Sequence, residues 1–408
     1  MNELNEKVSN LNYKSFIWHG AFLALASSFM DVDTIMPAML GEAGGKAIHM
    51  GILVMIMMGG SSFSQIFFAP YLHNKNFKKK FLLIGINLRI LALVAMTFLF
   101  YFFDSISNPL KLWFVLILTS LFSFSGAFAN ISYTDIIGKS IFQNKRKSFL
   151  SLKKLISAVG LLISAIMARK ILQSYNVPQN YIFLFIFASL FLFIASFGFW
   201  KLKEIKGKAK QIHNIKEFFL FMKKEIKQNK KLRNYLLLMN TLGVSITLMP
   251  FLILFAKENL TEANIFLGNL LFIKVVGGIL ISSILFYFSK KFKYTYTLYS
   301  IILLSFSILL IVFFSSIVPW LFYLSFFLSG LMFVIYSITI NGILLEITHN
   351  ENRAIYTGLV GAGNIIPTIF PLFGGWIIKN YSFNIFFLLI ASIILISIYY
   401  IKNLNCSV

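Results

Sequence analysis

Three charged residues stand inside stretches of the sequence that are otherwise apolar: Asp31, Asp33 and Lys274. The acids lie beyond the midpoint of the apolar run 16–40, and the lysine lies near the middle of the run 263–289. A charge deep in a bilayer costs about 2.5–3.5 kcal/mol, so it normally faces a protein interior or a wet cavity. Buried acids and amines of this kind carry protons or bind the ionic groups of a solute.

The spacing of the two acids leaves their roles open. Residues two apart are about 200° apart around a helix, so one acid should face a cavity unless the turn is unwound. Pro37 follows closely and removes a backbone hydrogen bond from this part of the run. We favour Asp31 as the proton site because it is nearer the midplane, with Lys274 as counter-ion or as binder of an anionic substrate group. The alternative is that Asp33 only caps a broken half-helix.

Uncharged polar residues are also sparse at depth. Four asparagines could line a cavity and bind substrate: Asn130, Asn240, Asn341 and Asn364. Hydrogen bonding between helices, worth about 0.6 kcal/mol per contact, is the commoner use of such residues. The sequence contains no glycine-rich phosphate loop, no metal-ligand spacing and no nucleophile motif. We therefore expect no cofactor, no bound metal and no enzyme activity.

The composition indicates the scaffold that holds these residues. The chain has 408 residues, of which 58% are hydrophobic and only 12% charged, which is typical of a polytopic membrane protein. A net charge of +23 could suggest nucleic-acid binding. The basic residues, however, lie in short segments between apolar runs, so we expect no nucleic-acid partner. The lone cysteine, Cys406, excludes an intrachain disulfide.

The apolar runs predict an all-α protein with twelve transmembrane helices. We place them at 16–40, 46–71, 81–103, 110–134, 149–172, 180–200, 234–257, 263–289, 295–317, 319–343, 354–379 and 382–401. Loops rich in Lys and Arg alternate with loops that are poor in them. By the positive-inside rule, both termini are cytoplasmic and the chain lies in the cytoplasmic cell membrane.

A lysine-rich segment, 201–233, divides the chain into two sets of six spans. We therefore predict an N-terminal bundle over 1–200, a cytoplasmic linker and a C-terminal bundle over 234–408. Apolar residues of the linker fall at helical spacing on one face: Ile215, Phe218, Phe219, Met222 and Ile226. This pattern predicts an amphipathic helix on the anionic cytoplasmic leaflet. A regulatory binding site for a partner is the alternative.

The two halves repeat each other weakly. Short motifs recur in the same order: Thr34–Pro37 with Thr247–Pro250, Gly59-Gly60 with Gly277-Gly278, and Lys75–Lys78 with Lys290–Lys293. Parallel repeats of six spans are a transporter architecture, with the binding site at the repeat interface. In this repeat Val244 and Ile246 are the counterparts of Asp31 and Asp33, so the fold itself does not require these acids.

With these motifs, the chain resembles the major facilitator superfamily over nearly its whole length. The loop 70–80 is similar to the family's motif between spans 2 and 3, with Asn74-Lys75 in place of an acid-base pair and Phe77 in place of glycine. Glu346 precedes Arg353 at a spacing that the family shows. In the family such charges latch the cytoplasmic side shut. The resemblance implies a gating role for Asn74, Lys75, Asp135, Arg146, Glu346 and Arg353, although Asp135 and Arg146 could equally be solvated helix-end charges.

Together these features predict a secondary active transporter that moves a small solute by alternating access. We expect protons as the coupling ion, the lipid bilayer as a partner and a monomeric chain. Uptake of a polar or zwitterionic solute and export of amphipathic or cationic compounds by proton antiport both stay open. A passive facilitator or sensor of the same fold is a further alternative.

Overall fold

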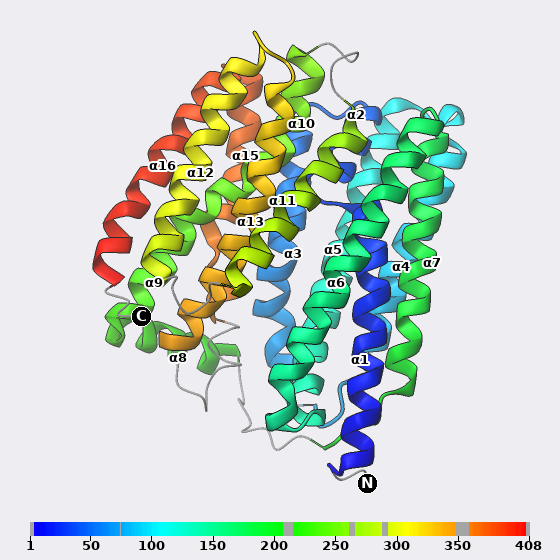
Figure 1. Cartoon of the computed structure of the whole chain (residues 1–408), viewed down its shortest axis with the longest axis vertical. Helices are drawn as coiled ribbons and strands as arrows, with labels where there is room; N and C mark the ends of the chain where they lie inside the picture. The colour runs from blue at the N-terminus through cyan, green and yellow to red at the C-terminus, as the bar shows by residue number, and fades with distance from the viewer. Residues whose placement is uncertain are drawn as a thin grey trace. The chain divides into compact units, whose positions relative to one another are not determined.

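The computed structural model describes residues 4–73, 75–206, 215–260, 266–287, 293–347 and 359–404. The first half holds α1 (Glu6–Ser27), η1 (Ser28–Met30), α2 (Ile35–Glu42), α3 (Ala47–His73), α4 (Lys79–Tyr101), η2 (Phe103–Ser105), α5 (Asn108–Ser140), α6 (Gln143–Ser174) and α7 (Gln179–Lys201). The rest holds α8 (Ile215–Gln228), α9 (Lys230–Leu242), η3 (Gly243–Thr247), α10 (Leu248–Asn259), α11 (Leu267–Tyr287), α12 (Tyr294–Ser315), α13 (Leu321–Ile347), α15 (Ile365–Asn380) and α16 (Phe383–Leu404). Figure 1 shows these helices along the chain.

The helices confirm the predicted fold class. Eleven segments of the described chain are long and apolar enough to cross a membrane, and α3 adds a shorter apolar stretch, Ala47–Gly60. These twelve segments correspond to the twelve predicted spans. Helices suit this environment because they satisfy every backbone hydrogen-bonding group within the segment, where lipid offers no partner. The chain is thus a multi-pass, all-α membrane protein.

Backbone contacts group the chain into two units. Unit 1 comprises Met1–Asp31 and Phe63–Phe218, and unit 2 comprises Val32–Ser62 and Phe219–Val408. Residues 32–62 therefore lie with the second half of the chain, whereas the division by sequence assigns them to the first bundle. Glycines account for this grouping. A Cβ on Gly51 of α3 would lie 2.3 Å from the Pro371 carbonyl oxygen of α15, so the two backbones touch.

Within unit 1, α1 lies against α6 and α7, while α4 lies against α5 and α7 (Figure 1). The fully buried ring of Phe16 on α1 has edge-to-face contacts with aromatic rings from the neighbouring helices: Tyr133, Phe149 and Phe199. Such pairs add about 0.5–1.5 kcal/mol each beyond their buried area. They fix α1 against three neighbouring helices.

Spans 1 and 7 are both interrupted at matching positions. Span 1 runs through α1, the short η1, a turn at residues 31–34 and α2, while span 7 runs through α9, η3 and α10. Pro37 and Pro250 each lie in the first turn of the second half-helix. Proline has no N–H to donate to the carbonyl four residues earlier, which is that of Asp33 or of Ile246. Each proline therefore favours a break where it is found.

Candidate functional site

The structure brings Asp33 and Lys274 together inside unit 2. The Lys274 Nζ donates a hydrogen bond to Asp33 Oδ2 over 2.6 Å. Both side chains are only 10% exposed. An ion pair that has lost its water needs close geometry to offset the desolvation of both charges, and this distance provides it.

The break in span 1 positions Asp33. The residue lies in the turn between η1 and α2, directly before Thr34, the N-cap of α2. Helical hydrogen bonding resumes with the Ala38 N–H, which donates to the Thr34 carbonyl over 3.1 Å. In an uninterrupted helix residues 31 and 33 would face opposite sides, and the turn removes that constraint.

Two glycines position Lys274 on α11. A Cβ on Gly330 of α13 would lie 2.0 Å from the Lys274 carbonyl oxygen, and one on Gly277 would lie 2.4 Å from the Phe327 carbonyl oxygen. Only residues without a side chain allow two helix backbones to approach so closely. The lysine stem is therefore held directly beside α13.

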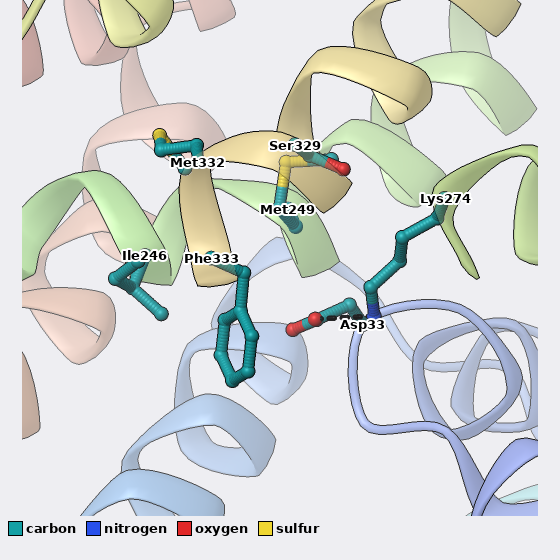
Figure 2. A pocket seen from close by; sticks show the side chains of 7 residues that line it. All are labelled: Asp33, Ile246, Met249, Lys274, Ser329, Met332 and Phe333. Atoms are coloured by element: carbon teal, nitrogen blue, oxygen red, sulfur yellow. Dashed lines mark hydrogen bonds and ion pairs between the residues drawn. The ribbon is translucent and has the colours of Figure 1, made fainter. Parts of the chain in front are cut away.

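The ion pair lines a tight pocket that is too small to hold a water molecule. Its other lining residues come from η3, α10 and α13: Ile246, Met249, Ser329, Met332 and Phe333. In Figure 2 the Asp33 carboxylate lies between the Lys274 amine and the ring of Phe333. Of these residues the sequence singles out only Ile246, as the apolar counterpart of Asp33 in the repeat. The sequence does not distinguish the other four, because single apolar residues and a serine are common in any membrane span.

Asp31 occupies a different place from Asp33. It is half-buried and is the last residue of the first segment of unit 1, whereas Asp33 belongs to unit 2. Val244 and Ile246, the counterparts of the two acids, both lie in η3 and are buried. The two halves thus share the break, and the first half alone carries carboxylates there.

The four asparagines are not gathered at this pocket. Asn240 on α9 donates to the Gly363 carbonyl over 2.7 Å and accepts from the Ile366 N–H over 2.8 Å. It therefore joins α9 to the start of α15. Asn364, the N-cap of α15, lies beside these two backbone groups. Asn130 and Asn341 are exposed on α5 and α13.

The predicted gating residues are described only in part. Asn74, Arg353 and the side chain of Arg146 lie outside the described residues. Lys75 is exposed, with its amine 4.8 Å from the centre of the Tyr71 ring. Glu346 is exposed near the end of α13.

Asp135 on α5 pairs with two lysines. Its Oδ1 lies 3.0 Å from Lys78 Nζ, and its Oδ2 contacts Lys139 one turn along the same helix. Burial lowers the pKa of Lys78, and the charge of Asp135 opposes this shift. The ion pair with Asp135 thus offsets part of the cost of burying the Lys78 amine at the start of α4.

A further acid at this end of unit 1 is not found by the sequence reasoning. Glu204, after α7, accepts hydrogen bonds from the N–H groups of Lys78 over 2.5 Å and Lys79 over 2.7 Å. A carboxylate at a helix N-terminus satisfies free N–H groups and the positive end of the helix dipole. Glu204 supplies a carboxylate beside a loop that lacks the family's acid. An acid among the lysines that follow span 6, in Lys201-Leu202-Lys203-Glu204, is the signal that could have found it.

Comparisons with known proteins agree with this architecture. The model of the Major Facilitator Superfamily matches residues 17–361 and, separately, 235–403. A search of curated proteins gives no match.

Solved structures of similar fold include the nucleoside transporter NupG, with a TM-score of 0.64 and 15% identity over 99% of this chain and 100% of that one. An auto-inhibited POT family peptide transporter has a TM-score of 0.70 and 10% identity over 97% and 96% of the two chains. A bacterial homologue of the iron transporter ferroportin, in an inward-facing state, has a TM-score of 0.67 and 11% identity over 96% and 98%. With its family match, its twelve spans and these neighbours, the chain belongs to the Major Facilitator Superfamily and is a membrane transporter, not an enzyme.

Proposed function

We propose that this transporter couples the movement of a small solute to protons through the Asp33–Lys274 pair. The observation that carries the proposal is the 2.6 Å ion pair in the break of span 1. When the pair separates, each charge must be compensated in another way, because an unpaired charge in low dielectric is costly. A proton can neutralise the carboxylate, so separation of the pair and proton uptake become linked.

The pocket favours a zwitterionic solute. Asp33 can receive a cationic group and Lys274 an anionic one, so a solute with both groups compensates both charges at once. Ser329 adds a hydroxyl, while Met249 and Phe333 offer apolar contact. Amino acids and short peptides are solutes of this chemistry. Nucleosides, which the neighbour NupG carries by its name, lack the paired charges.

A second candidate is proton antiport of cationic amphipathic compounds. Two methionines and a phenylalanine line the pocket around Asp33: Met249, Met332 and Phe333. Methionine side chains adapt to varied apolar shapes, so this lining also suits a lipophilic cation. In that mechanism the substrate and a proton compete for Asp33. An outward-directed substrate flux driven by entering protons distinguishes it from uptake.

The same proposal places both termini and the linker 201–233 on the cytoplasmic side of the cytoplasmic membrane, with α8 on the anionic leaflet and the chain acting as a monomer. The charges of Asp135, Glu346 and Arg353 act there as a cytoplasmic latch. The positive-inside distribution of Lys and Arg supports this orientation.

The test begins with thermal-shift screening of the purified protein against amino acids, dipeptides, nucleosides, organic acids and cationic dyes. The compound that stabilises it is then used in proteoliposomes with an imposed pH gradient. Asp33→Asn should abolish accumulation driven by the gradient while substrate exchange continues, because exchange needs no net proton transfer. Asp31→Asn is the matched control, since it alters an acid two residues away in the same turn.

The outcomes separate the alternatives. Accumulation lost in Asp33→Asn and kept in Asp31→Asn supports the proposal. The reverse pattern would move the proton site to Asp31. Equilibration of the solute without accumulation, with or without the pH gradient, would instead indicate a passive facilitator in the wild type.

A further inference from the structure

Two basic side chains on the helices of unit 1 are not used by the proposed mechanism. Arg89 is the eleventh residue of α4, and Lys153 is the eleventh residue of α6. Both are partly exposed. Arg89 lies near the middle of the span Lys79–Tyr101, where an arginine costs about 2.5–3.5 kcal/mol, and Lys153 is the second residue of the apolar stretch Leu152–Ser174.

Lys153 reaches across unit 1 to two other helices. Its stem packs on Gly20 of α1, where an added Cβ would lie 3.2 Å from Lys153 Cγ. Its Nζ donates to the Tyr133 hydroxyl of α5 over 2.7 Å. An ammonium group has three donors, and the hydroxyl accepts one of them.

Arg89, on α4, contacts the same helix, α5. Its guanidinium carbon lies 4.1 Å from the centre of the Phe122 ring, and its Nε would lie 2.9 Å from a Cβ on Gly126. The Nε is buried and has no hydrogen-bond partner within the described chain. The ring attracts the cation but accepts no charge-neutralising bond, so a donor remains unused.

The two cations approach one face of α5. Gly126 and Tyr133, which mark the contacts of Arg89 and Lys153, are seven residues apart, which is two helical turns or roughly 10 Å along the helix. Both charges also lie near enough to His19 of α1 to act on its ring electrostatically. His19 is buried between the rings of Tyr133 and Phe199.

Three of the described acids of unit 1 are engaged away from Arg89 and Lys153. Asp135 pairs with lysines at the start of α4 and the end of α5, Glu6 pairs with Lys145, and Glu204 binds the N-terminus of α4. No carboxylate forms an ion pair with Arg89 or Lys153 within the described ranges. The charges of Arg89 and Lys153 are therefore not offset by an ion pair within the described residues.

We propose that unit 1 holds a binding site for a compact oxyanion, a carboxylate or phosphate group, between Arg89 and Lys153. A guanidinium presents a planar fork of donors that matches these groups, and an ammonium adds a mobile point charge. The anion would take the unused donors and offset both charges. The site uses residues of unit 1 alone and does not depend on coupling at Asp33–Lys274.

The test uses sodium phosphate and sodium acetate as probes on the purified full-length protein. Each is titrated in place of a bulky sulfonate at constant ionic strength and pH, and the unfolding temperature is recorded. A site gives a saturable rise in the wild type, because a ligand that binds only the folded state stabilises it. The response to phosphate or to acetate shows which oxyanion the site takes.

Four variants locate the site. Lys153→Gln and Arg89→Gln should each weaken the apparent affinity at least tenfold, while Lys153→Arg should keep most of it. Lys154→Gln is the matched control, because Lys154 is the exposed neighbour of Lys153 on the same helix. Without probe, Lys153→Gln should not lower the unfolding temperature, since it removes an uncompensated charge. A purely structural lysine would instead be destabilising to lose.

A second measurement needs no variant. The anion should protect Lys153 of the wild type from reductive methylation, while Lys154 in the same peptide reacts as before. The proposal is overturned if neither probe gives a saturable response, if Lys154→Gln loses as much affinity as Lys153→Gln, or if Lys153 is not protected. Loss of the response in Lys274→Gln alone would also overturn it, because the anion would then bind at the ion pair of unit 2.

Discussion

At the scale of single residues, burial makes the charges of Asp33 and Lys274 depend on each other. Each side chain is 10% exposed, so neither can be solvated if the other is removed. A different pair, Glu42 and Lys257, has the same chemistry at 3.1 Å but side chains that are 35% and 45% exposed. Comparing variants of the two pairs therefore separates the effect of charge on stability from the effect of burial.

Neutralising one member of the buried pair should be more harmful than neutralising both. Asp33→Asn or Lys274→Met should each lower the free energy of unfolding by about 3–5 kcal/mol, because a buried charge is left uncompensated. The double variant should lose less free energy of unfolding than either single variant does. Lys257→Met, the control, should change the free energy of unfolding by about 1 kcal/mol or less. Unfolding in SDS measures all four. Additive costs for the two substitutions would contradict the interdependence.

The sequence predicts which residues are unusual but not which of them meet. Asp31, Asp33 and Lys274 stand out because charge is rare in apolar spans. Their depth favours Asp31, whereas the structure pairs Asp33 with Lys274. That choice depends on the turn at residues 31–34 and on a partner 241 residues away, and helical periodicity contains neither. Met249 and Phe333 could not be selected because apolar residues fill every span.

At the scale of helices, the site depends on close approaches that only glycine allows. Gly277 and Gly278 both lie on α11, and Gly330 faces them from α13. The sequence shows the pair Gly277-Gly278 as a repeat motif, but only coordinates reveal which glycine touches backbone. The contacts of Glu204 are likewise visible only in the coordinates, because its partners at Lys78 and Lys79 are more than a hundred residues away in the sequence.

Gly330→Ala should force α11 and α13 apart. The new Cβ would lie 2.0 Å from the Lys274 carbonyl oxygen, and backbone cannot yield as a flexible side chain can. We expect a loss of about 1–3 kcal/mol in stability and a displaced Lys274. Gly278→Ala is the control, because its nearest atoms would lie at 3.4 and 3.6 Å, which is ordinary contact. Equal unfolding free energies for the two variants would contradict the close approach.

Asn240→Ala should loosen the junction between α9 and the start of α15. The Asn240 side chain donates to the Gly363 carbonyl and accepts from the Ile366 N–H, and both groups would lose this hydrogen bond. A buried polar group without a partner costs about 1–3 kcal/mol. Asn341→Ala is the comparison, since Asn341 is exposed and bonds only to the Ser337 carbonyl of its own helix. A similar small effect of both substitutions on SDS unfolding would argue against the junction.

At the scale of the whole molecule, composition determines most of what can be foreseen. Apolar runs of about twenty residues are long enough to cross the bilayer core, so the twelve spans follow from the sequence. Pro37 and Pro250 indicate where two of them break. The grouping of residues 32–62 with unit 2 does not follow from the sequence, because it depends on the contact of Gly51 with Pro371.

The predicted orientation can be checked by labelling single cysteines. In a Cys406→Ser background, Leu220→Cys on α8 should react with an impermeant maleimide in inverted vesicles but not in intact cells. Asp104→Cys, in the loop between α4 and α5, should show the opposite pattern. Both positions are exposed, with Leu220 at 66%, so access to reagent depends on the side of the membrane. Labelling of Leu220→Cys in intact cells would reverse the orientation.

The long separation of Asp33 and Lys274 has a consequence during synthesis. The acid leaves the ribosome 241 residues before the amine, which at 5–20 residues per second is an interval of roughly 12–48 s. During that interval span 1 must stay near water or carry a neutral carboxyl, because Lys274 does not yet exist. A chain that stops before span 8 keeps this exposed acid permanently. The ion pair therefore marks chains that have been synthesised through span 8, and membrane quality control that recognises charged spans would selectively remove those that stop earlier.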